Sequence, residues 1–489
     1  MSRHAAAGAA ALLLTTAPAA WADLSAEAVW ADWQALYERF GGQLTATSES
    51  YEGGVLTLEG VQLGSDLAGA EMTSSGVGPI RLIEQSDGSL TVEIPERIPF
   101  ETTTTVDDET ITQSGEMTLA GTDLVIREAG AGRTYDMTAD AFTYVFDVPE
   151  TENQEETAVS MTMRDIASTY TSGQGGSATS FVQDLTASGM AVIIGVEGED
   201  SMDVTYEMTG ITSSFAGDYG EGTVEPGASL SDLGLTYGGA LAHTGSTLSV
   251  AGTGGSGPLQ IDGTSEAGSI DIDLTAEKLG YTVTSTGGQV TAQVPQFPLP
   301  IAISMDELRS GFAMPIGAGP EERPFGLDIA MMNLVVDDAL WSLFDPTGQL
   351  PRDPATLIVD VDGSAVMTAD IFGDPEAMAA LGGPPGELKS ATIDEIRLTV
   401  AGAELRADGA VTFPTPDPSQ PVGTVNLALD GGNALLDALV ALGFVPAQNA
   451  GFIRGMAGAV ARPVGDDQLE SKIEFTPGGG ISANGMPLR

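Results

Sequence analysis

The sequence predicts a mainly β protein, an extended antiparallel meander or groove-like sheet with an N-terminal helix and a C-terminal helix pair packed on it. Three observations predict this fold. Apolar and polar residues alternate with a period of two through most of the chain. Gly-containing turns recur about every 8–15 residues, which is typical of all-β meanders and sandwiches. A helical period appears clearly in one segment near the N-terminus and in two near the C-terminus.

Residues 1–22 have the composition of a secretory signal peptide. Arg3 precedes a short apolar core, and the A-x-A pattern of Ala20 and Ala22 predicts cleavage before Asp23. The apolar core is too short to span a bilayer, and no later stretch reaches about 18 uninterrupted apolar residues. We therefore expect a periplasmic protein with no transmembrane segment in its mature chain.

The first expected element of the mature chain is a helix within residues 23–42. Ser25 can cap its N-terminus, Val29 and Trp33 belong to its apolar stripe, and a glycine pair ends it at residue 42. Such a stripe is typical of core packing rather than of a ligand site.

We expect an antiparallel β region over residues 43–293, a Pro-rich connection at 294–300 and a second β region over 301–489. The sequence VPQFPLP makes 294–300 the best candidate boundary, because proline is hard to place in a central strand. Within the second region we expect helices near residues 374–382, 433–443 and 446–462. The apolar circumference of residues 433–443 predicts burial against the sheet or at one end of it.

A loose internal echo links three segments. Each has an alternating start, an apolar residue after a break, and a Thr/Ser/Gly exit; they are residues 161–173, 206–217 and 274–288. The match is too degenerate for a named repeat family. It fits consecutive strands of one extended sheet.

The charge balance excludes several function classes. The 489 residues include 69 acidic and 18 basic side chains, a net charge of −51. Such a charge repels nucleic acid and anionic membrane surfaces, so neither is an expected partner. It indicates a salty working environment, or divalent cations, that screen the self-repulsion. Because cysteine is absent, disulfides are excluded.

The motifs of common enzymes and cofactor sites are missing or incomplete. Residues 252–257 read G-T-G-G-S-G, but an extended segment follows where a dinucleotide site needs a helix, so we interpret them as a β-turn. His243 is the only histidine that remains after removal of the predicted signal, and no G-x-S-x-G elbow is present. We therefore expect no cofactor, no structural zinc, copper or haem site, and no enzymatic activity.

Carboxylates are the remaining candidates for chemistry. Asp360 and Asp362 share one strand face in V-D-V-D-G, which makes them a candidate surface calcium site, although the other ligands of an EF-hand loop are missing. The alternative interpretation is two solvated residues on a strand whose inward face is Leu357, Val359 and Val361. The Asp-Pro pairs upstream, which begin at residues 345 and 353, predict a rigid turn into this strand.

Several segments resemble an uncharacterised alphaproteobacterial family called domain of unknown function 2125. They are residues 337–363, which include DDALWSLFDPTGQLPRDP, residues 386–413, the C-terminal helix pair, and the ending SKIEFTPGGGISANGMPL. The sheet, buried helix pair and final hairpin are also similar to AsmA-like envelope proteins, which form long β grooves associated with lipid transport or outer-membrane maintenance. The chain departs from that second group because it lacks a membrane anchor.

Three functions remain open. The favoured one is a non-enzymatic periplasmic protein that binds an apolar or amphipathic, lipid-like envelope component in a sheet-lined groove. The second is a structural or protein-interaction component of the envelope. The third is a carboxylate-based glycan hydrolase, which needs two acids facing each other about 5–10 Å apart across a cleft.

Overall fold

The computed structural model describes residues 24–39, 42–67, 70–74, 77–106, 109–148, 156–173, 179–198, 201–220, 234–254, 257–297, 299–371 and 381–489. The predicted cleavage residues Ala20, Ala22 and Asp23 lie outside this part of the chain. The expected helix at 374–382 also lies almost entirely outside it.

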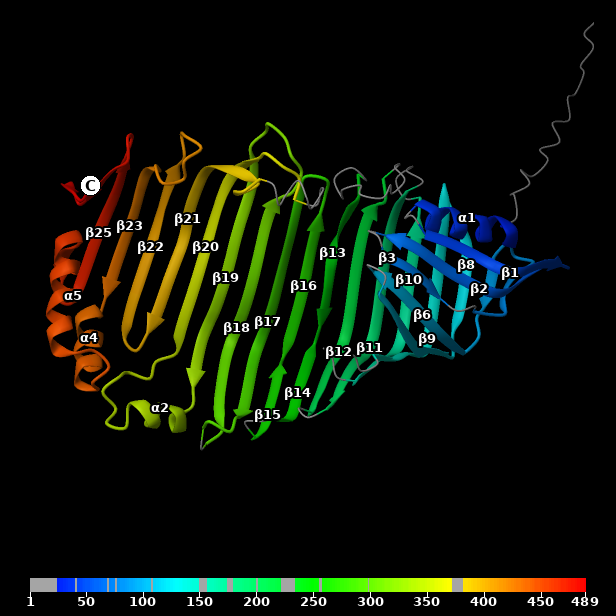
Figure 1. Ribbon diagram of the computed structural model, residues 1–489, viewed down its shortest axis with the longest axis horizontal. Helices are drawn as coiled ribbons and strands as arrows, with labels where there is room; N and C mark the ends of the chain where they lie inside the picture. Colours follow the sequence, from blue (N-terminus) through cyan, green and yellow to red (C-terminus); the bar gives the residue numbers. More distant parts are fainter. Residues whose placement is uncertain are drawn as a thin grey trace, which may run out of the picture.

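The described residues form a 27-stranded, antiparallel sheet accompanied by helices (Figure 1). The helices are α1 (Ala26–Arg39), α2 (Asp338–Phe344), α4 (Gly432–Ala441) and α5 (Ala447–Val460). The first strands are β1 (Gly42–Glu52), β2 (Val55–Leu67), β3 (Ala70–Ser74), β4 (Ile80–Glu84), β5 (Leu90–Glu93), β6 (Arg97–Val106), β7 (Glu109–Ala120), β8 (Asp123–Ala129) and β9 (Gly132–Val148).

The central and C-terminal strands complete the sheet. The central ones are β10 (Glu156–Ser172), β11 (Ser180–Glu197), β12 (Ser201–Asp218), β13 (Thr236–His243), β14 (Gly245–Gly254), β15 (Gly257–Ser265), β16 (Ala267–Leu274), β17 (Lys278–Gln293), β18 (Ile301–Pro315) and β19 (Arg323–Val336). The last are β20 (Ala355–Met367), β21 (Gly386–Val400), β22 (Ala403–Thr412), β23 (Val422–Asp430), β24 (Arg462–Gly465), β25 (Gln468–Thr476), β26 (Gly480–Ala483) and β27 (Met486–Pro487).

Strand pairing mostly follows chain order, as expected for a meander. From β9 to β12 and from β17 to β23 each strand pairs with the next one. Between β12 and β17 the sheet divides into two ribbons, β13–β16 and β14–β15, because one half of β12 pairs with β13 and the other half with β14. A similar division lies between β2 and β9, where β4–β5–β8 and β3–β6–β7 form the two ribbons.

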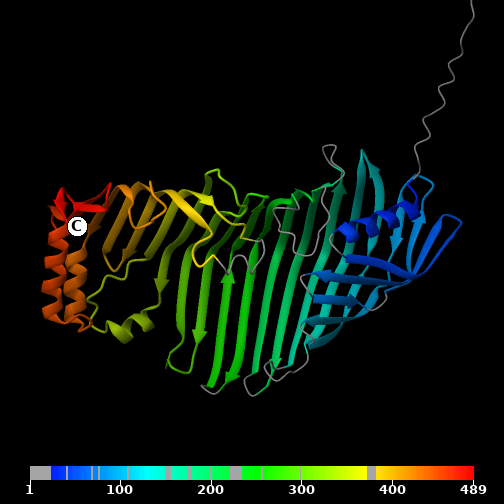
Figure 2. The same cartoon turned by 45° about the horizontal axis from the view of Figure 1, so that its top comes forward.

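The sheet confirms the predicted mainly β fold with its N-terminal helix and C-terminal helix pair. Figures 1 and 2 show the strands side by side along the long axis, with α1 at one end and α4 and α5 at the other. The Pro-rich residues 294–300 connect β17 to β18, which pair directly with each other. α2 was not predicted; Asp337 caps it by accepting the backbone N–H of Leu340 at 2.9 Å.

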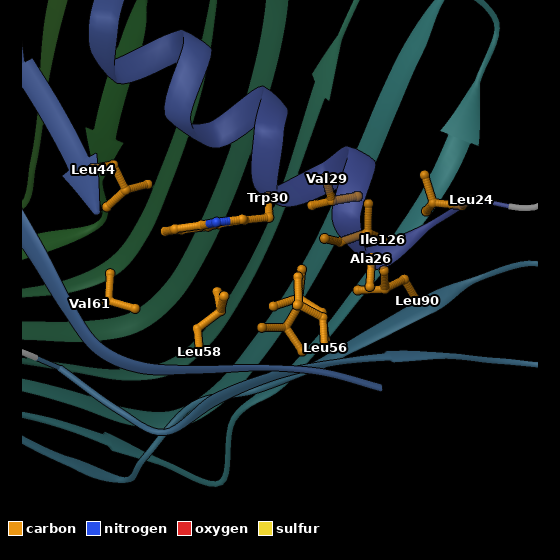
Figure 3. Packing of buried hydrophobic residues seen from close by; sticks show 12 residues of the cluster. Leu24, Ala26, Val29, Trp30, Leu44, Leu56, Leu58, Val61, Leu90 and Ile126 are labelled. Atoms are coloured by element: carbon orange, nitrogen blue, oxygen red, sulfur yellow. The ribbon is translucent and has the colours of Figure 1, made fainter. Parts of the chain in front are cut away.

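The largest core cluster of buried residues lies under α1 (Figure 3). Val29 and Trp30 of this helix pack on leucines of β2, β4 and β5, among them Leu58 and Leu82, and on Ile126 of β8. Ser25 begins the helix by accepting the backbone N–H of Ala28. The predicted apolar stripe is therefore core. None of the helices in the described residues is both long and apolar enough to cross a bilayer.

Candidate apolar binding face

The long central strands bend at one residue each, and the bends align across the sheet. In the ladders between β9, β10, β11 and β12, the regular pairing is interrupted where Asp140 faces Asp165 and where Ser188 faces Gly210. The same gap recurs between β17 and β18 at Gly287. We call this line the crease; its residues are Gly121, Asp140, Asp165, Ser188, Gly210, Thr244, Glu266, Gly287, Asp306 and Asn333.

Backbone conformation and short polar side chains hold the crease. Asp165, Gly210 and Asn333 have φ of 50°, 59° and 54°, in the left-handed region that glycine, Asn and Asp tolerate best. The hydroxyl of Ser188 donates to the Asp165 carboxylate at 2.6 Å. The amide of Asn333 donates to Asp306 at 2.8 Å. One residue of each strand is skipped and the two lie opposite each other, so the bend is built into both strands of each pair without a change of register.

The crease keeps apolar side chains on one side of the sheet. Because neighbouring residues of a strand point to opposite faces, one additional residue at the bend shifts the apolar positions from even to odd numbers or back. In β12, for example, Tyr206 and Met208 precede the bend and Ile211 follows it. We name the two parts by Figure 1: the upper half-sheet contains β13 and β16, and the lower half-sheet contains β14 and β15.

A buried cluster at the crease shows that the sheet bends toward its apolar side. Ile211 of β12 is only 2% exposed. The main contacts of the helices are with other strands: α1 packs on β1, β2 and β4, α2 on β18, and α4 on β22. The burial of Ile211 therefore comes from the sheet itself. The cluster combines Leu185 and Leu241 of the upper half-sheet with Met163 and Met190 of the lower one. On the other side of the bend, Asp165 and Ser188 are exposed.

Apolar side chains continue away from the crease in rows that cross many strands. In the upper half-sheet, directly paired residues form one row of Phe215, Gly239, Ile272, Tyr281, Phe312, Leu327, Val361 and Ile393. A second row contains Leu241, Ile270, Val283, Ser310, Ile329, Val359 and Ile396. The lower half-sheet contributes Tyr144, Met161, Val192, Tyr206, Leu248, Gly263, Val290, Ile303 and Val336.

The rows are open to solvent in the middle of the molecule. Tyr281 and Val283 are each 39% exposed, and Ile270 and Leu327 are similarly exposed. Contiguous exposed apolar surface of this extent is rare on soluble proteins and marks interaction sites. We call these rows, on both half-sheets, the apolar face.

The opposite side of the sheet is polar. Arg309 of β18 forms an ion pair with Asp328 on the neighbouring strand β19 at 3.0 Å. Arg406 of β22 forms one with Asp430 on the neighbouring strand β23 at 2.9 Å. Cross-strand ion pairs of this kind are typical of a solvated sheet face. The sheet is thus amphipathic, with water expected on one side and an apolar surface on the other.

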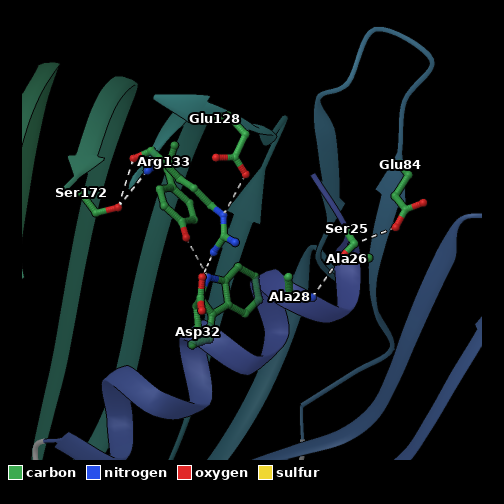
Figure 4. Close-up of polar contacts among 10 residues, drawn as sticks. Ser25, Ala26, Ala28, Asp32, Glu84, Glu128, Arg133 and Ser172 are labelled. Carbon is green, nitrogen blue, oxygen red and sulfur yellow. Dashed lines mark hydrogen bonds and ion pairs between the residues drawn. The ribbon is translucent and has the colours of Figure 1, made fainter. Parts of the chain in front are cut away.

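Helix α1 covers the N-terminal end of the apolar face. The Trp33 indole N–H donates to the Tyr135 hydroxyl of β9 at 3.4 Å. Arg133 of the same strand forms an ion pair with Asp32 of α1 (Figure 4). The carboxylate of Glu128 lies 3.7 Å from the Arg133 guanidinium. These contacts attach the helix to the strands beneath it.

An aromatic chain leads from α1 toward the middle of the sheet. Tyr135 contacts Tyr170 with ring centroids 5.7 Å apart, Phe181 stacks on Tyr219 at 4.5 Å, and further contacts reach Tyr237 of β13. Burial raises the pKa of Tyr170 and Tyr237 above the usual phenol value, so both hydroxyls stay neutral. The surface that leads from α1 toward β13 is therefore rich in aromatic rings with neutral hydroxyls.

The predicted calcium residues lie on the polar side. Asp360 and Asp362 of β20 and Asp394 of β21 bring one carboxylate oxygen each within 4.8 Å of one another. Burial raises the pKa of Asp360, and the carboxylates of Asp328, Asp394 and Asp362 raise it further, while Arg309 opposes them. Sequence reasoning missed Asp394, because a bulge between β20 and β21 places it beside the pair.

A shallow hollow of about 690 Å³ adjoins these acids. Its floor consists of glycine and alanine residues such as Gly280, Gly311 and Ala313, which leave space between taller neighbours. Asp271, Lys278 and Asp328 are among its charged lining residues. The recess is therefore lined by charged side chains of the polar side, and its lining also includes Tyr281, Phe312 and Leu327 of the apolar rows.

The other motifs occupy structural positions. Residues 252–257 lie at the β14–β15 hairpin, with residues 255 and 256 outside the described part of the chain. His243 is half-buried at the end of β13, where it packs closely on Gly268. Asp345 is fully buried and accepts backbone N–H groups of the turn before β20.

Comparison with known proteins identifies one family. Residues 242–480 match the model of the family described as "Uncharacterized protein conserved in bacteria (DUF2125)". This range contains β14–β25 and the C-terminal helices. Neither a curated protein nor a solved structure matches the chain.

Proposed function

Through residues 242–480 the chain belongs to the DUF2125 family, and we propose that it is an exported, non-enzymatic protein that binds an acyl chain of an envelope component along its apolar face. The observation that carries the proposal is the continuous apolar face, which remains open to solvent between α1 and the C-terminal helices.

The dimensions of the apolar face suit extended chains. Neighbouring strands lie about 4.8 Å apart, so the row of eight strands from β12 to β21 extends for about 34 Å. One acyl chain reaches about half of the ~30 Å hydrocarbon core of a bilayer. The upper half-sheet alone therefore has room for an acyl chain laid across the strands.

The chemistry of the apolar face favours acyl recognition over recognition of a headgroup. Its rows consist of aliphatic, aromatic and small residues, and none of the row residues carries a charge. Each CH₂ group removed from water contributes about 0.8 kcal/mol. A long chain thus gains affinity by apolar contact, while a polar headgroup remains in solvent.

Strand β17 offers a matched test of this proposal. Tyr281 and Val283 point to the apolar face, whereas Thr282 and Thr284 of the same strand point to the polar side. We expect the double variant Tyr281→Gln/Val283→Gln to bind a fluorescent C16 fatty acid about tenfold more weakly than the wild type. The control Thr282→Gln/Thr284→Gln should bind as the wild type does.

Fluorescence titration of both purified variants and of the wild type measures these affinities. Equal weakening in the two double variants, or no fatty-acid binding by the wild type, would contradict the proposal. Circular dichroism before titration checks that both variants are folded.

A further inference from the structure

Helix α5 presents the most exposed large apolar residues of the described chain. Phe452 is 69% exposed and Met456 57%, and Ile453 and Phe444 are exposed as well. Phe452 and Met456 are four residues apart and therefore adjacent on one helix face, whereas Ala450, on the opposite face, is buried. Figures 1 and 2 show α5 as the outermost element of the C-terminal end. We call Phe444, Phe452, Ile453 and Met456 the C-terminal patch.

The segment around the patch differs in charge from the rest of the molecule. No Asp or Glu occurs from Ala438 to Gly465, although 69 of the 489 residues are acidic and a run of this length would ordinarily contain about four. The segment contains Arg454 and Arg462, which pair with Asp437 and Glu470 at its borders. This end of a strongly acidic protein is thus apolar and free of acidic residues from Ala438 to Gly465.

We propose that the C-terminal patch inserts into the surface of a lipid bilayer, so that this end of the sheet rests on a membrane. An exposed helix with aromatic, aliphatic and Met side chains on one face has the form of an interfacial helix. The absence of acids next to the patch lowers the local repulsion, although the −51 net charge of the whole chain still acts at longer range.

Size also favours a bilayer over a second protein. Four side chains exposed by roughly half present a few hundred Å² of apolar surface, enough to mark an interaction site. A stable protein interface buries about 800 Å² on each partner. Insertion into a lipid surface needs no such area, because surrounding lipid covers each side chain completely.

The patch lies where the apolar face ends. α4 follows β23 directly and packs on β22. Leu405 of β22 pairs with Leu398 of β21 and with Leu429 of β23, so apolar side chains continue across the strands to this end of the sheet. A bilayer at this end would therefore adjoin the surface that we propose for acyl chains. The membrane contact does not depend on that function, since it concerns different residues.

Vesicle flotation tests the contact. We expect the full chain to float with zwitterionic phosphatidylcholine vesicles, and Phe452→Ser/Met456→Ser to bind them about tenfold more weakly. The control Ile193→Ser/Val335→Ser removes two apolar residues, 47% and 42% exposed, from the polar side of the sheet and should bind as the wild type does. With vesicles that contain phosphatidylglycerol, binding should increase with salt, because screening weakens the repulsion between the acidic body and the membrane.

Three results would overturn the proposal: no flotation of the wild type, equal loss in both double variants, or a concentration-dependent dimer that Phe452→Ser/Met456→Ser abolishes while flotation stays unchanged. The last result would assign the patch to contact between copies of the chain. Fatty-acid binding without vesicles should be the same in the wild type and in Phe452→Ser/Met456→Ser, so failure of the membrane contact is distinguishable from failure of the acyl-binding function.

Discussion

Asp345 shows how a carboxylate in this acidic chain serves the fold. Its side chain is fully buried, and its two oxygens accept the backbone N–H groups of Gln349 and Leu350 at 2.8 Å each. These hydrogen bonds lower its pKa, with that from Leu350 the stronger, and the nearby Arg352 acts in the same direction. The Asp-Pro turn that the sequence predicts is present, but its burial was not predictable, because solvent access depends on strands distant in sequence.

We expect Asp345→Asn to lower the free energy of unfolding by about 2 kcal/mol at pH 7, because an amide cannot accept both N–H groups. The lowered pKa means that the wild-type carboxylate stabilises the fold above the unfolded value of about 3.9 and loses this effect as pH falls through the folded pKa. The difference between variant and wild type should therefore shrink on acidification. Urea unfolding from pH 7 to pH 3 measures this difference in unfolding free energy, and Asp353→Asn, at an exposed position, is the control. A difference that does not change with pH would refute the stabilising role of the Asp345 carboxylate.

Asp360 has the opposite behaviour. It pairs directly with Asp328 across β19 and β20, and its pKa is raised. The ionised form is thus disfavoured in the fold, and the wild type loses stability as pH rises from about 3.9 through the folded pKa. We expect Asp360→Asn to be more stable than the wild type at pH 7 by roughly 0.5–1 kcal/mol, and equal to it below about pH 3. Thermal unfolding of the wild type and of Asp360→Asn at both pH values measures the difference. A variant that is less stable than the wild type at pH 7 would contradict this prediction.

The calcium expectation for Asp360 and Asp362 stays a prediction. If the three clustered carboxylates hold Ca²⁺, the ion should raise the unfolding temperature of the wild type beyond the effect of NaCl at equal ionic strength. Asp394→Asn should lose that increment. The same unfolding temperature in CaCl₂ and NaCl would leave the acids as solvated strand residues.

At the scale of elements, the crease explains the internal echo. The segments M-T-M-R-D-I in β10 and Y-E-M-T-G-I in β12 both place two apolar residues before the bend and one three positions later. The sequence thus shows the break in period, but not that the breaks align, because alignment depends on the register of every ladder. The third segment, residues 274–288, runs from the end of β16 through most of β17.

A substitution at Gly210 tests most directly whether the crease depends on a glycine. The φ of Gly210 is 59°, and a Cβ there would collide with the hydroxyl of Thr244. We expect Gly210→Ala to destabilise the protein by about 2 kcal/mol or more, from the left-handed backbone and the collision together. Gly195→Ala in β11 is the control, since its nearest neighbour, Asp203, is at 3.6 Å. Equal urea midpoints for the two variants would show that the bend does not depend on glycine.

The helices show where sequence patterns mislead. The apolar circumference of residues 433–443 predicts burial, yet Leu436 is the one buried residue of α4, and most of α5 is exposed. Composition reports how apolar a helix is, but not whether neighbouring strands extend far enough to cover it. α2 escaped prediction because its seven residues are too few to show a helical period.

At the scale of the whole molecule, alternation and turn spacing were sufficient to predict one long antiparallel sheet. They also predicted that Leu357, Val359 and Val361 share a face opposite Asp360 and Asp362. The division of the sheet into ribbons, the crease and the cover of α1 over the N-terminal end were not predictable, since each joins residues far apart in sequence. Together they give an amphipathic sheet whose apolar face is open between its two ends.

Photo-crosslinking with a diazirine-labelled C16 fatty acid tests the acyl-binding account most directly. After irradiation and proteolysis, we expect mass spectrometry to find the label on apolar-face residues of β17–β20, such as Tyr281, Phe312 and Leu327. Unlabelled fatty acid should compete with this labelling. Label distributed equally over the polar side, on Thr282 and Thr284 as much as on Tyr281, or labelling that competitor does not reduce, would contradict the account.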